Sequence, residues 1–388
     1  MIKPRELDHT RQVYLSGYFG AGNFGDELGL RALYSSFSGM GYKVVFAAHD
    51  PAVYDGDLHA SCISKRSRIK RIVAIYNSDI VLSGPGGIFK RPGKKLWWSM
   101  VVTSLWDPII AAILSKKVAV FGVSCAQSMK PLDGFLLRKC MAGNLLFSRD
   151  QRSTGVFKSH RINAFTSSDI LFMVDPVSLG SPKVDEKLRI LIAPSASDMR
   201  NGGPTAFELA KAILTFIEKH GMSSVEILGV ACQPEDLDHI DKINNHGVQI
   251  DRTLDWRHGD PLLAVSDLHS NDIVISQRFH AALLSAIAGL RVYVIGHDPK
   301  LEDLATTILP KVIFPLNNAD IGGKEQANQF EASSGIAEGL HQDIRDNFVT
   351  MIDMTERKQV RSLLTRFVLF ILIVIATFCQ FFAKAVRQ

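Results

Sequence analysis

Short apolar runs alternate with longer stretches of mixed polarity along most of the 388-residue chain. Each run has the length of a buried strand, and the stretches between the runs leave room for helices, so the pattern predicts parallel α/β sheets. The first set of expected strands covers residues 13–17, 43–48, 79–84 and 117–124. The second set covers residues 188–194, 225–230, 272–276 and 292–296.

The chain is longer than a single hydrophobic core usually supports, which indicates two domains. A segment rich in proline, serine and charge, residues 175–187, separates the two sets of strands and is typical of a linker. We expect a Rossmann-like domain at residues 1–178, a linker at 179–187, a second Rossmann-like domain at 188–320 and a helical connecting region at 321–365. Doubly wound domains of this kind, facing each other across a cleft, bind ligands at the carboxyl ends of their strands.

The C-terminal apolar run differs from all the others. Phe367–Ala383 contains 17 residues without a charge, with Arg361 and Arg366 before it and Lys384 after it. This length is the lower limit for a membrane-spanning helix, and flanking cations suit contact with lipid headgroups. We expect a single transmembrane anchor at residues 366–384, and the alternative is a buried or amphipathic helix. Because the N-terminus is polar and unlike a secretory signal, we expect the catalytic domains on the cytoplasmic side.

Composition and charge narrow the classes of function. Apolar residues make up 46% of the chain and charged residues 21%, which indicates a globular protein. The formal net charge of +5 is too small to indicate nucleic-acid binding. Positive charge clusters at residues 65–71 and 90–95, a pattern typical of a surface that meets phosphates or acidic lipid, and also of a solvated helix face. The five cysteines lie far apart, so we expect no metal site and no disulfide framework.

A glycine-rich segment follows the first expected strand. Gly20, Gly22 and Gly25 match the GxGxxG fingerprint of dinucleotide-binding loops. Asp26 and Glu27 follow at once, however, and two carboxylates in the first helical turn would repel a pyrophosphate. The two acids suit the positive end of the helix dipole, or they accept hydrogen bonds and protons from a neutral sugar. The alternative without a ligand is a tight turn with an acidic helix cap.

A second glycine-rich segment follows the third expected strand. Gly86 and Gly87 leave the backbone at the carboxyl edge of the sheet open to a ligand. The four cations that come next are mixed with Trp97 and Trp98. This mixture suits a membrane interface, and it suits equally a surface helix whose tryptophans pack inward.

Arg149 lies at the end of an expected strand in the segment Leu146–Ser153 (LFSRDQRS). A guanidinium at the end of a strand is well placed to bind a carboxylate or a phosphate through two parallel hydrogen bonds. The alternative is an ion pair with Asp150 or with another nearby acid.

The segment Ile275–Gly296 is the most specific of the four. A strand ends at Ser276, and Arg278 and His280 lie where the next helix begins. The arginine supplies a fixed anion-binding group, and the histidine supplies a group that titrates near neutrality. A histidine beside an apolar helix is often structural, but the neighbouring arginine and the position at the carboxyl edge favour a functional role.

Together these motifs resemble those of the polysaccharide pyruvyl transferase family. The matching segments are, in the family's order, Gly17–Glu27 (GYFGAGNFGDE), Gly84–Gly87 (GPGG), Phe121–Gln127 (FGVSCAQ), Ser148–Asp150 (SRD) and Ser276–Ala281 (SQRFHA). They cover about residues 11–305, and the first and last segments together form the specific part of the resemblance.

The resemblance implies a GT-B-like pair of Rossmann-type domains and phosphoenolpyruvate as the donor, with no further cofactor. It implies as acceptor a hexose or hexosamine in a polysaccharide or lipid-linked glycan. It carries catalytic and donor-binding roles onto Arg278 and His280, and a donor-anion role onto Arg149. The residues expected to bind substrate are Arg149, Gly20, Gly22, Asn23, Gly25, Asp26, Glu27, Gly86, Gly87 and Ser276.

Other functions stay open at this point. A GT-B-like glycosyltransferase would share the fold, and Arg278 with His280 would suit the diphosphate of a nucleotide sugar. An inactive membrane scaffold of polysaccharide assembly is the alternative without catalysis, and Asp26 and Glu27 disfavour a dinucleotide-dependent oxidoreductase. Phosphoenolpyruvate carries a carboxylate and a phosphate, so its site needs at least two cations, and one histidine can give and take the protons of ketal formation. We therefore predict a pyruvyltransferase.

Overall fold

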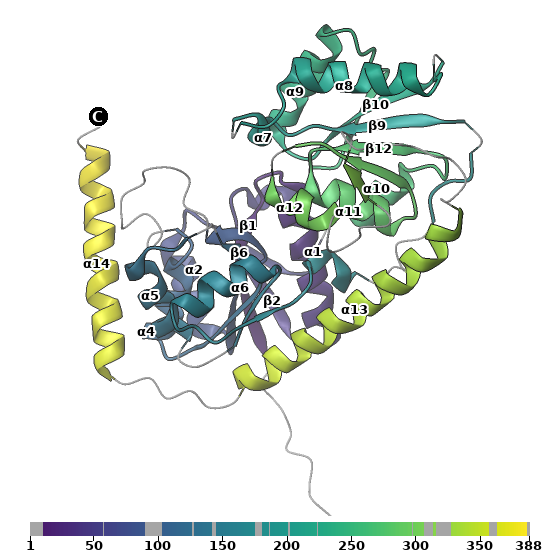
Figure 1. Cartoon of the computed structure of the whole chain (residues 1–388). Helices are drawn as coiled ribbons and strands as arrows, with labels where there is room; N and C mark the ends of the chain where they lie inside the picture. Colours follow the sequence, from purple (N-terminus) through teal and green to yellow (C-terminus); the bar gives the residue numbers. More distant parts are fainter. Residues whose placement is uncertain are drawn as a thin grey trace, which may run out of the picture. The chain divides into compact units, whose positions relative to one another are not determined.

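The computed structural model describes residues 11–56, 58–89, 103–125, 128–141, 145–174, 181–185, 187–200, 202–222, 224–296, 298–305, 313–315, 327–356 and 363–385. The chain divides into two compact units, each built on a parallel sheet with helices packed against it (Figure 1). The first unit comprises Met1–Ala21, Gly29–Met173 and Gln342–Gln388, and the second comprises Gly22–Leu28 and Val174–His341. The predicted α/β class with parallel sheets is confirmed.

The sheet of the first unit has the order β3-β2-β1-β4-β6-β7-β8, and β5 pairs with β6. Every pairing in the described part of this sheet is parallel. Val13, Tyr14 and Leu15 of β1 are all fully buried, which explains why the strand is a continuous apolar run: helices cover both faces of such a sheet. The strands are β1 (Gln12–Phe19), β2 (Lys43–Ala48), β3 (Ser61–Ser64), β4 (Ile80–Ser83), β5 (Gly86–Phe89), β6 (Lys117–Cys125), β7 (Leu146–Ser148) and β8 (Ala164–Thr166).

The sheet of the second unit has the order β11-β10-β9-β12-β13-β14 and is also parallel in its described part. The direction in which successive strands are added reverses between β9 and β12, so the switch point of this sheet lies between these two strands. All eight strands predicted from the sequence are present, four in each sheet. The strands are β9 (Arg189–Ala193), β10 (Glu226–Ala231), β11 (Arg252–Asp255), β12 (Ile273–Ser276), β13 (Arg291–Val294) and β14 (Ile313–Pro315).

Local capping signals fix where several helices begin. The side chain of Thr205 accepts a hydrogen bond from the Glu208 amide, and Glu208 accepts one from the Thr205 amide, which starts α8 with a capping box. The α-helices are α1 (Phe24–Gly39), α2 (Arg68–Asn77), α4 (Trp106–Ile113), α5 (Pro131–Met141), α6 (Gln151–Ser159), α7 (Ala196–Arg200), α8 (Ala206–Lys219), α9 (Pro234–Asn245), α10 (Pro261–Ser266), α11 (Phe279–Ile287), α12 (Pro299–Asp303), α13 (Ala327–Glu356) and α14 (Leu363–Ala385). Two short 3₁₀ helices cover Pro51–Tyr54 and Ile170–Met173.

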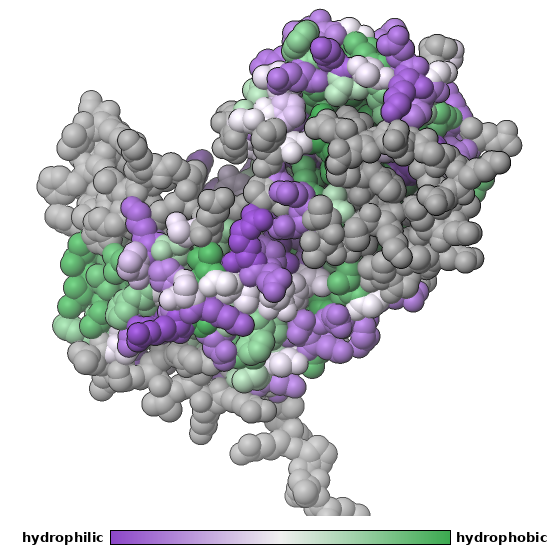
Figure 2. All heavy atoms as spheres, viewed as in Figure 1, coloured by the Kyte–Doolittle hydropathy of each residue, from purple (hydrophilic) through white to green (hydrophobic). Residues whose placement is uncertain are grey.

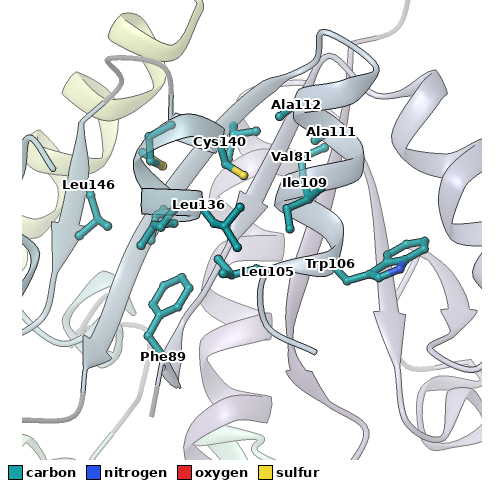
Figure 3. Packing of buried hydrophobic residues seen from close by; sticks show 14 of the residues in the cluster. Val81, Phe89, Leu105, Trp106, Ile109, Ala111, Ala112, Leu136, Cys140 and Leu146 are labelled. Atoms are coloured by element: carbon teal, nitrogen blue, oxygen red, sulfur yellow. The ribbon is translucent and has the colours of Figure 1, made fainter. Parts of the chain in front are cut away.

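The core of the first unit lies between the sheet and the helices α2, α4 and α5. Figure 3 shows Leu105, just before α4, and Ile109, within it, beside Leu136 and Cys140 of α5. All of these side chains are buried, and burying a side chain of this size contributes about 1.5–3 kcal/mol to stability.

A buried ion pair ties α2 to α4. Nη2 of Arg71 donates to Oδ1 of Asp107 at 2.6 Å, and the guanidinium lies 4.4 Å from the centre of the Trp106 ring. The hydroxyl of Ser16 donates to the other carboxylate oxygen of Asp107 at 2.6 Å. Because the charges of Arg71 and Asp107 are paired inside the fold, α2 is held in a fixed position on α4.

The predicted transmembrane anchor at residues 366–384 is not supported. The run is helical, as α14, but Leu369, Ile373 and Ala376 recur at helical spacing and bury one face of the helix in the core of the first unit. Arg366 donates from Nε to the carbonyl oxygen of Ile113 at 2.8 Å, which fixes α14 against the end of α4. Among the residues that the structure describes, no helix is both long enough and apolar enough to cross a membrane.

Some predicted features lie outside the described residues. These are the cations at 90–95 with Trp97 and Trp98, most of the linker at 175–187, Cys379 and the side chains of α14 after Thr377. The predicted connecting region at 321–365 contains α13, whose Phe348 packs against Phe37 of α1 and Phe121 of β6, with ring centres 5.2 Å apart in both pairs.

His239 of α9 is an unusual core residue. Its side chain is 1% exposed, and neither ring nitrogen has a hydrogen-bond partner in the described part of the chain. Burial lowers the pKa of His239, and Lys242 and Arg278 lower it further, while Asp236 acts in the opposite direction. The unfolded chain therefore binds a proton at His239 at a higher pH than the folded chain does, and stability is lost as the pH falls through this range.

We expect His239→Leu to stabilise the protein, because it removes a buried polar group without hydrogen bonds. The free energy of unfolding should rise by about 1 kcal/mol at about pH 8 and by more at about pH 5.5, below the ordinary histidine pKa of about 6.5. Urea titrations at both pH values measure the effect. His246→Leu, at the exposed end of the same helix, is the control and should change little. An equal gain at both pH values would show that protonation of His239 has no part in it.

Candidate active site at the carboxyl edge of the second sheet

Side chains just beyond β9 and β12 tie these neighbouring strands together. Oε1 of Gln277 accepts a hydrogen bond from the Ser195 amide at 2.9 Å, and the Gln277 amide donates to the carbonyl of Ala193 at 2.8 Å. The hydroxyl of Ser276 accepts from the Arg278 amide at 2.9 Å and donates to the Arg278 carbonyl at 2.8 Å. Ser276 is fully buried, and both of these hydrogen bonds join its hydroxyl to the backbone of Arg278, the residue that precedes α11.

Arg278, the N-cap residue of α11, is bound by a carboxylate from the first turn of α9. Its Nε donates to Oδ2 of Asp236 at 3.0 Å and to the carbonyl of Pro194 at 3.2 Å, and its Nη2 donates to Oδ1 of Asp236. Asp236 also accepts from the amides of Cys232 and Gln233 at 3.1 and 2.9 Å, and it is fully buried. The guanidinium is thus fixed in orientation where β9, β10 and β12 end.

His280 lies in the first turn of α11 and packs against the first turn of α1. The ideal position of a Cβ atom on Gly25 would be 2.0 Å from Nδ1 and 2.3 Å from Cε1 of the His280 ring. Glycine is therefore required at residue 25 for the imidazole to lie where it does. The contact lies within the second unit, since Gly22–Leu28 belongs to that unit.

The rest of the segment Gly22–Leu28 is also bound at this edge. The amide of Phe24 donates to the carbonyl of Cys232 at 2.9 Å, and the Phe24 ring packs on Trp256 with the ring centres 5.5 Å apart. Gly22 adopts a φ of +69°, and a Cβ atom there would be 3.5 Å from Pro234. These contacts hold the start of α1 beside the starts of α9 and α11.

Polar residues of the same segment shape the first turn of α1. The side-chain Oδ1 of Asn23 accepts a hydrogen bond from the Gly25 amide at 3.2 Å. The backbone carbonyl of Asn23 accepts hydrogen bonds from the amides of Asp26 and Glu27, both at 3.0 Å. Asn23 therefore caps the helix. Glu27 is only 1% exposed and lies against Gly259, while Asp26 is half-buried. Of the two acids, Asp26 is the one with surface left to meet a ligand.

The remaining predicted glycines belong to the first unit. Gly20 has a φ of +70°, and a Cβ atom there would come within 2.8 Å of the Asp50 carbonyl oxygen, so only glycine fits. Gly86 and Gly87 are the first two residues of β5, and β5 pairs with β6. They stand in a short strand rather than in an open loop.

Arg149 also lies in the first unit and is buried. Its Nη1 donates to Oδ2 of Asp169 at 3.2 Å, and its Nη2 donates to the hydroxyl of Ser124 at 3.2 Å. Asp150, a possible partner in the sequence, instead caps α6 by accepting from the Ser153 amide at 2.7 Å. The donor-anion role of Arg149 stays a prediction.

The model of the polysaccharide pyruvyl transferase family matches residues 23–299. The chain belongs to this family. It is accordingly a transferase of polysaccharide biosynthesis, and family membership supports a role in pyruvyl transfer. No curated protein sequence matches the chain.

Solved structures share the fold at low sequence identity. The UDP-GlcNAc 2-epimerase of Neisseria meningitidis, solved with UDP-GlcNAc bound, has a TM-score of 0.51 and 10% identity, covering 88% of this chain and 100% of its own. A protein assigned as a UDP-N-acetylglucosamine 2-epimerase from Listeria monocytogenes has a TM-score of 0.51 and 12% identity, covering 91% and 98%. A glycosyltransferase of Rickettsia africae has a TM-score of 0.47 and 14% identity, covering 90% and 96%. The first two likenesses support the predicted GT-B-like fold.

The family match includes most of the predicted site. Of the predicted residues, Asn23, Gly25, Asp26, Glu27, Gly86, Gly87, Arg149, Ser276, Arg278 and His280 lie within the matched range. The structure brings together the group from Gly22 to Glu27 with Ser276, Arg278 and His280 in one unit. The start of α1, which holds the later part of the first glycine-rich motif, thus lies beside the RFHA motif at the carboxyl edge of the second sheet.

Three residues of this site were not predicted. Asp236 lies two residues after Pro234, in the first turn of the helix that follows β10. A proline followed by acidic residues is typical of a helix start, and this was the signal in the sequence that could have located Asp236. Gln277 stands between two predicted residues, and Cys232 receives the start of α1 through its carbonyl. Burial raises the pKa of the Cys232 thiol, so it stays protonated and is not a nucleophile near neutral pH. Among the described residues, no three histidine, cysteine or acidic side chains are grouped to hold a metal ion.

We expect Gly25→Ala to act on the site through His280 alone. Gly25 lies in a helical turn that alanine adopts readily, so the cost should come from the methyl group that displaces the imidazole. Gly25→Ala should lower the free energy of unfolding by about 1–3 kcal/mol in the wild-type background and much less in His280→Ala. Urea titrations of the four proteins of this double-mutant cycle measure the coupling.

Gly39→Ala provides the matched control, because a Cβ atom at Gly39, near the other end of α1, would meet no described atom within 4 Å. It should change stability little in either background. The same cost of Gly25→Ala with and without the imidazole would contradict the contact.

Proposed function

We propose that this family member transfers the pyruvyl group of phosphoenolpyruvate onto two hydroxyls of a glycan, forming a cyclic ketal and releasing inorganic phosphate. The observation that carries the proposal is the grouping of His280, Arg278 and the start of α1 at the switch point of the second sheet. Ligands of doubly wound sheets bind at this position. The family match supports pyruvyl transfer as the reaction.

The donor is bound by cations and by helix starts. The carboxylate and phosphate of phosphoenolpyruvate need at least two positive groups, and Arg278 supplies a guanidinium whose orientation Asp236 holds. The first turn of α11 adds the partial positive charge of the helix dipole at the same edge. For Arg149 of the first unit, a role in binding an acidic group of the donor is proposed on the family resemblance alone.

In the proposed reaction His280 acts as the general acid and the general base. In its protonated form it donates a proton to the vinyl carbon of the donor, and one acceptor hydroxyl then bonds to the adjacent carbon and loses its own proton. The carbon–oxygen bond to phosphate breaks, inorganic phosphate leaves, and the second hydroxyl closes the ketal while its proton returns to a base. One imidazole serves as the acid at the start and the base at the end, a contribution of about 10²–10⁴-fold in rate. Asp26, which keeps some exposure, is placed to accept a hydrogen bond from a sugar hydroxyl.

The acceptor and the location follow from the same proposal. Phosphoenolpyruvate is a cytosolic metabolite, and the proposed acceptor is a polysaccharide or a lipid-linked glycan, so we place the catalytic units on the cytoplasmic side. No cofactor besides the donor enters this reaction.

The test is a direct assay. The full-length protein is incubated with phosphoenolpyruvate and glycan acceptors, and phosphate release is measured together with the ketal methyl group by NMR. Stoichiometric phosphate and ketal are expected. Thermal unfolding with phosphoenolpyruvate or UDP-GlcNAc gives a second readout, because a ligand at about 100 times its dissociation constant stabilises by about 2.7 kcal/mol. Stabilisation by UDP-GlcNAc alone, with no ketal, would favour a nucleotide-sugar glycosyltransferase instead.

A further inference from the structure

Two helices of the first unit carry an unusual share of exposed apolar side chains. The structure describes twenty large apolar side chains as exposed, and ten of these lie on α2 and α14. Their exposed fractions run from 37% to 78%. They are Ile69, Ile72, Val73 and Tyr76 on α2, and Phe367, Val368, Phe370, Ile371, Val374 and Ile375 on α14. Figure 2 shows the apolar surface of α14 at the left of the molecule.

Both helices are firmly packed on their other faces. Ala74 and Ile75 of α2 and Leu369 and Ile373 of α14 belong to one hydrophobic core. Helix α4 contacts both helices, through the Arg71–Asp107 ion pair on one side and through the Arg366 hydrogen bond on the other (Figure 1). The exposed apolar faces therefore belong to ordered helices, and no rearrangement is needed to present them.

The exposed charges carried by the helices of this region are of one sign. Helices α2, α4, α5 and α14 contain two acidic residues, Asp107 and Asp133, and both are buried. The basic residues of the same helices with described side chains are Arg68, Lys70, Arg71, Arg138, Lys139 and Arg366. Lys116, just after α4, lies 5.2 Å from the ring of Tyr76. In their described part the four helices thus carry cations and no exposed acid, although Arg71 is buried and paired with Asp107, and the exposed Asp79 follows α2.

We propose that the exposed faces of α2 and α14, together with these cations, form a membrane-binding surface that inserts into the interface of an anionic bilayer. Aliphatic and aromatic side chains with cations beside them are the composition by which helices lie in the plane of a membrane. The exposed apolar residues of α14 lie between Phe367 and Ile375, about 12 Å of helix at about 1.5 Å per residue. Its buried face stays on the protein, which is the difference from a spanning helix.

Charge complementarity selects a lipid surface over a second copy of the chain. Two copies joined through these faces would place like charges against each other, whereas an anionic leaflet attracts all of them. The inference goes beyond the proposed function, because binding to lipid requires neither phosphoenolpyruvate nor turnover. Its consequence for function is that the enzyme would stand where a lipid-linked acceptor is displayed.

Flotation with lipid vesicles tests the proposal on the full-length protein. It should float with vesicles that contain phosphatidylglycerol, float less with pure phosphatidylcholine, and lose part of its binding at high salt. Ile69→Glu and Phe370→Glu should each weaken binding by about tenfold or more, because they place a charge in the inserted face. Phe207→Glu, on α8 of the second unit, is the matched control, since Phe207 is 58% exposed and Phe370 is 52% exposed. It should bind as the wild type does.

Several results would overturn the proposal. Vesicle binding by Ile69→Glu and Phe370→Glu equal to that of the wild type would exclude the surface, and so would a wild-type protein that binds neither kind of vesicle. If the two variants instead convert a dimer to a monomer without affecting lipid binding, the surface joins copies of the chain. Retention of the wild-type protein in cell membranes through alkaline carbonate would indicate a span, whereas release supports interfacial binding. Ketal formation on a soluble acceptor should be unchanged in the variants, so a failure here is distinct from a failure of the proposed function.

Discussion

Replacing His280 with alanine should lower kcat for pyruvyl transfer by about 10²–10⁴-fold, the range that general acid–base catalysis contributes. The His280 imidazole is half-buried in the first turn of α11 and packs against Gly25 of α1. The variant should therefore fold and still bind the donor. The measurement is the rate of phosphate release at saturating phosphoenolpyruvate, with donor affinity taken from thermal unfolding.

A matched control separates catalysis from a general change at this edge. His258 follows β11 at the same edge of the sheet and is exposed, so His258→Ala should retain most of the activity. If His280→Ala kept more than about a tenth of the wild-type rate, the effect would be too small for a general acid and base. The role of His280 would then be limited to positioning the start of α1.

The strands could be predicted because a strand in a sheet buried on both faces consists of consecutive apolar residues. Residues of β9 and β12 are buried along their whole length, so each strand is an unbroken apolar run ending where the polar edge begins. That pattern also located Ser276, Arg278 and His280 at a carboxyl edge. It could not reveal which strands are neighbours, because β9 and β12 pair although 79 residues of chain, Pro194–Asp272, separate them.

The partners of the predicted site residues depend on that missing order of strands. Asp236 stands 42 residues before Arg278, and Asp169 stands 20 residues after Arg149. Neither separation corresponds to a helical or a strand repeat, so no local rule joins the pairs. The first turn of α1 is a similar case: Gly25 is 255 residues from His280, and only the packing of Gly22–Leu28 within the second unit brings them into contact.

The membrane span predicted at residues 366–384 is a part of the sequence analysis that the structure does not support. Its sequence is apolar on every face, and hydropathy alone does not distinguish a helix in lipid from a helix that packs on protein with one face. Helix α4 supplies the covering surface, and Leu369, Ile373 and Ala376 fill it. Helix α4 lies more than 250 residues earlier in the chain, so the sequence around α14 does not indicate that the two helices are in contact.

Replacing Asp236 with leucine removes the acidic partner of Arg278 and should destabilise the protein strongly. Asp236 is fully buried, and it accepts hydrogen bonds from the guanidinium and from two backbone amides. Asp236→Leu leaves the guanidinium without its buried counter-charge, so the free energy of unfolding should fall by about 3–5 kcal/mol. Urea titration measures this loss, and transfer activity should fall with it.

The double variant Asp236→Leu, Arg278→Met then separates structure from donor binding. Replacing both charges with apolar groups of similar size should recover most of the stability, because no charge is left buried and unpaired. Activity should not recover, since Arg278 is proposed to bind an acidic group of phosphoenolpyruvate while Asp236 only orients it. Arg278→Lys should also raise the Michaelis constant for the donor, because an ammonium group does not reproduce a planar fork of N–H donors.

The comparison of stability with activity decides between the two roles of Arg278. If the double variant regains both stability and turnover, the guanidinium serves only to join the ends of β9, β10 and β12, and the donor's anionic groups must be bound elsewhere at this edge. If it regains stability alone, the arginine has two functions at once. Asp236 then holds the guanidinium in the orientation that the donor requires, and the buried carboxylate is retained because a freely rotating arginine would lose more entropy on binding each substrate.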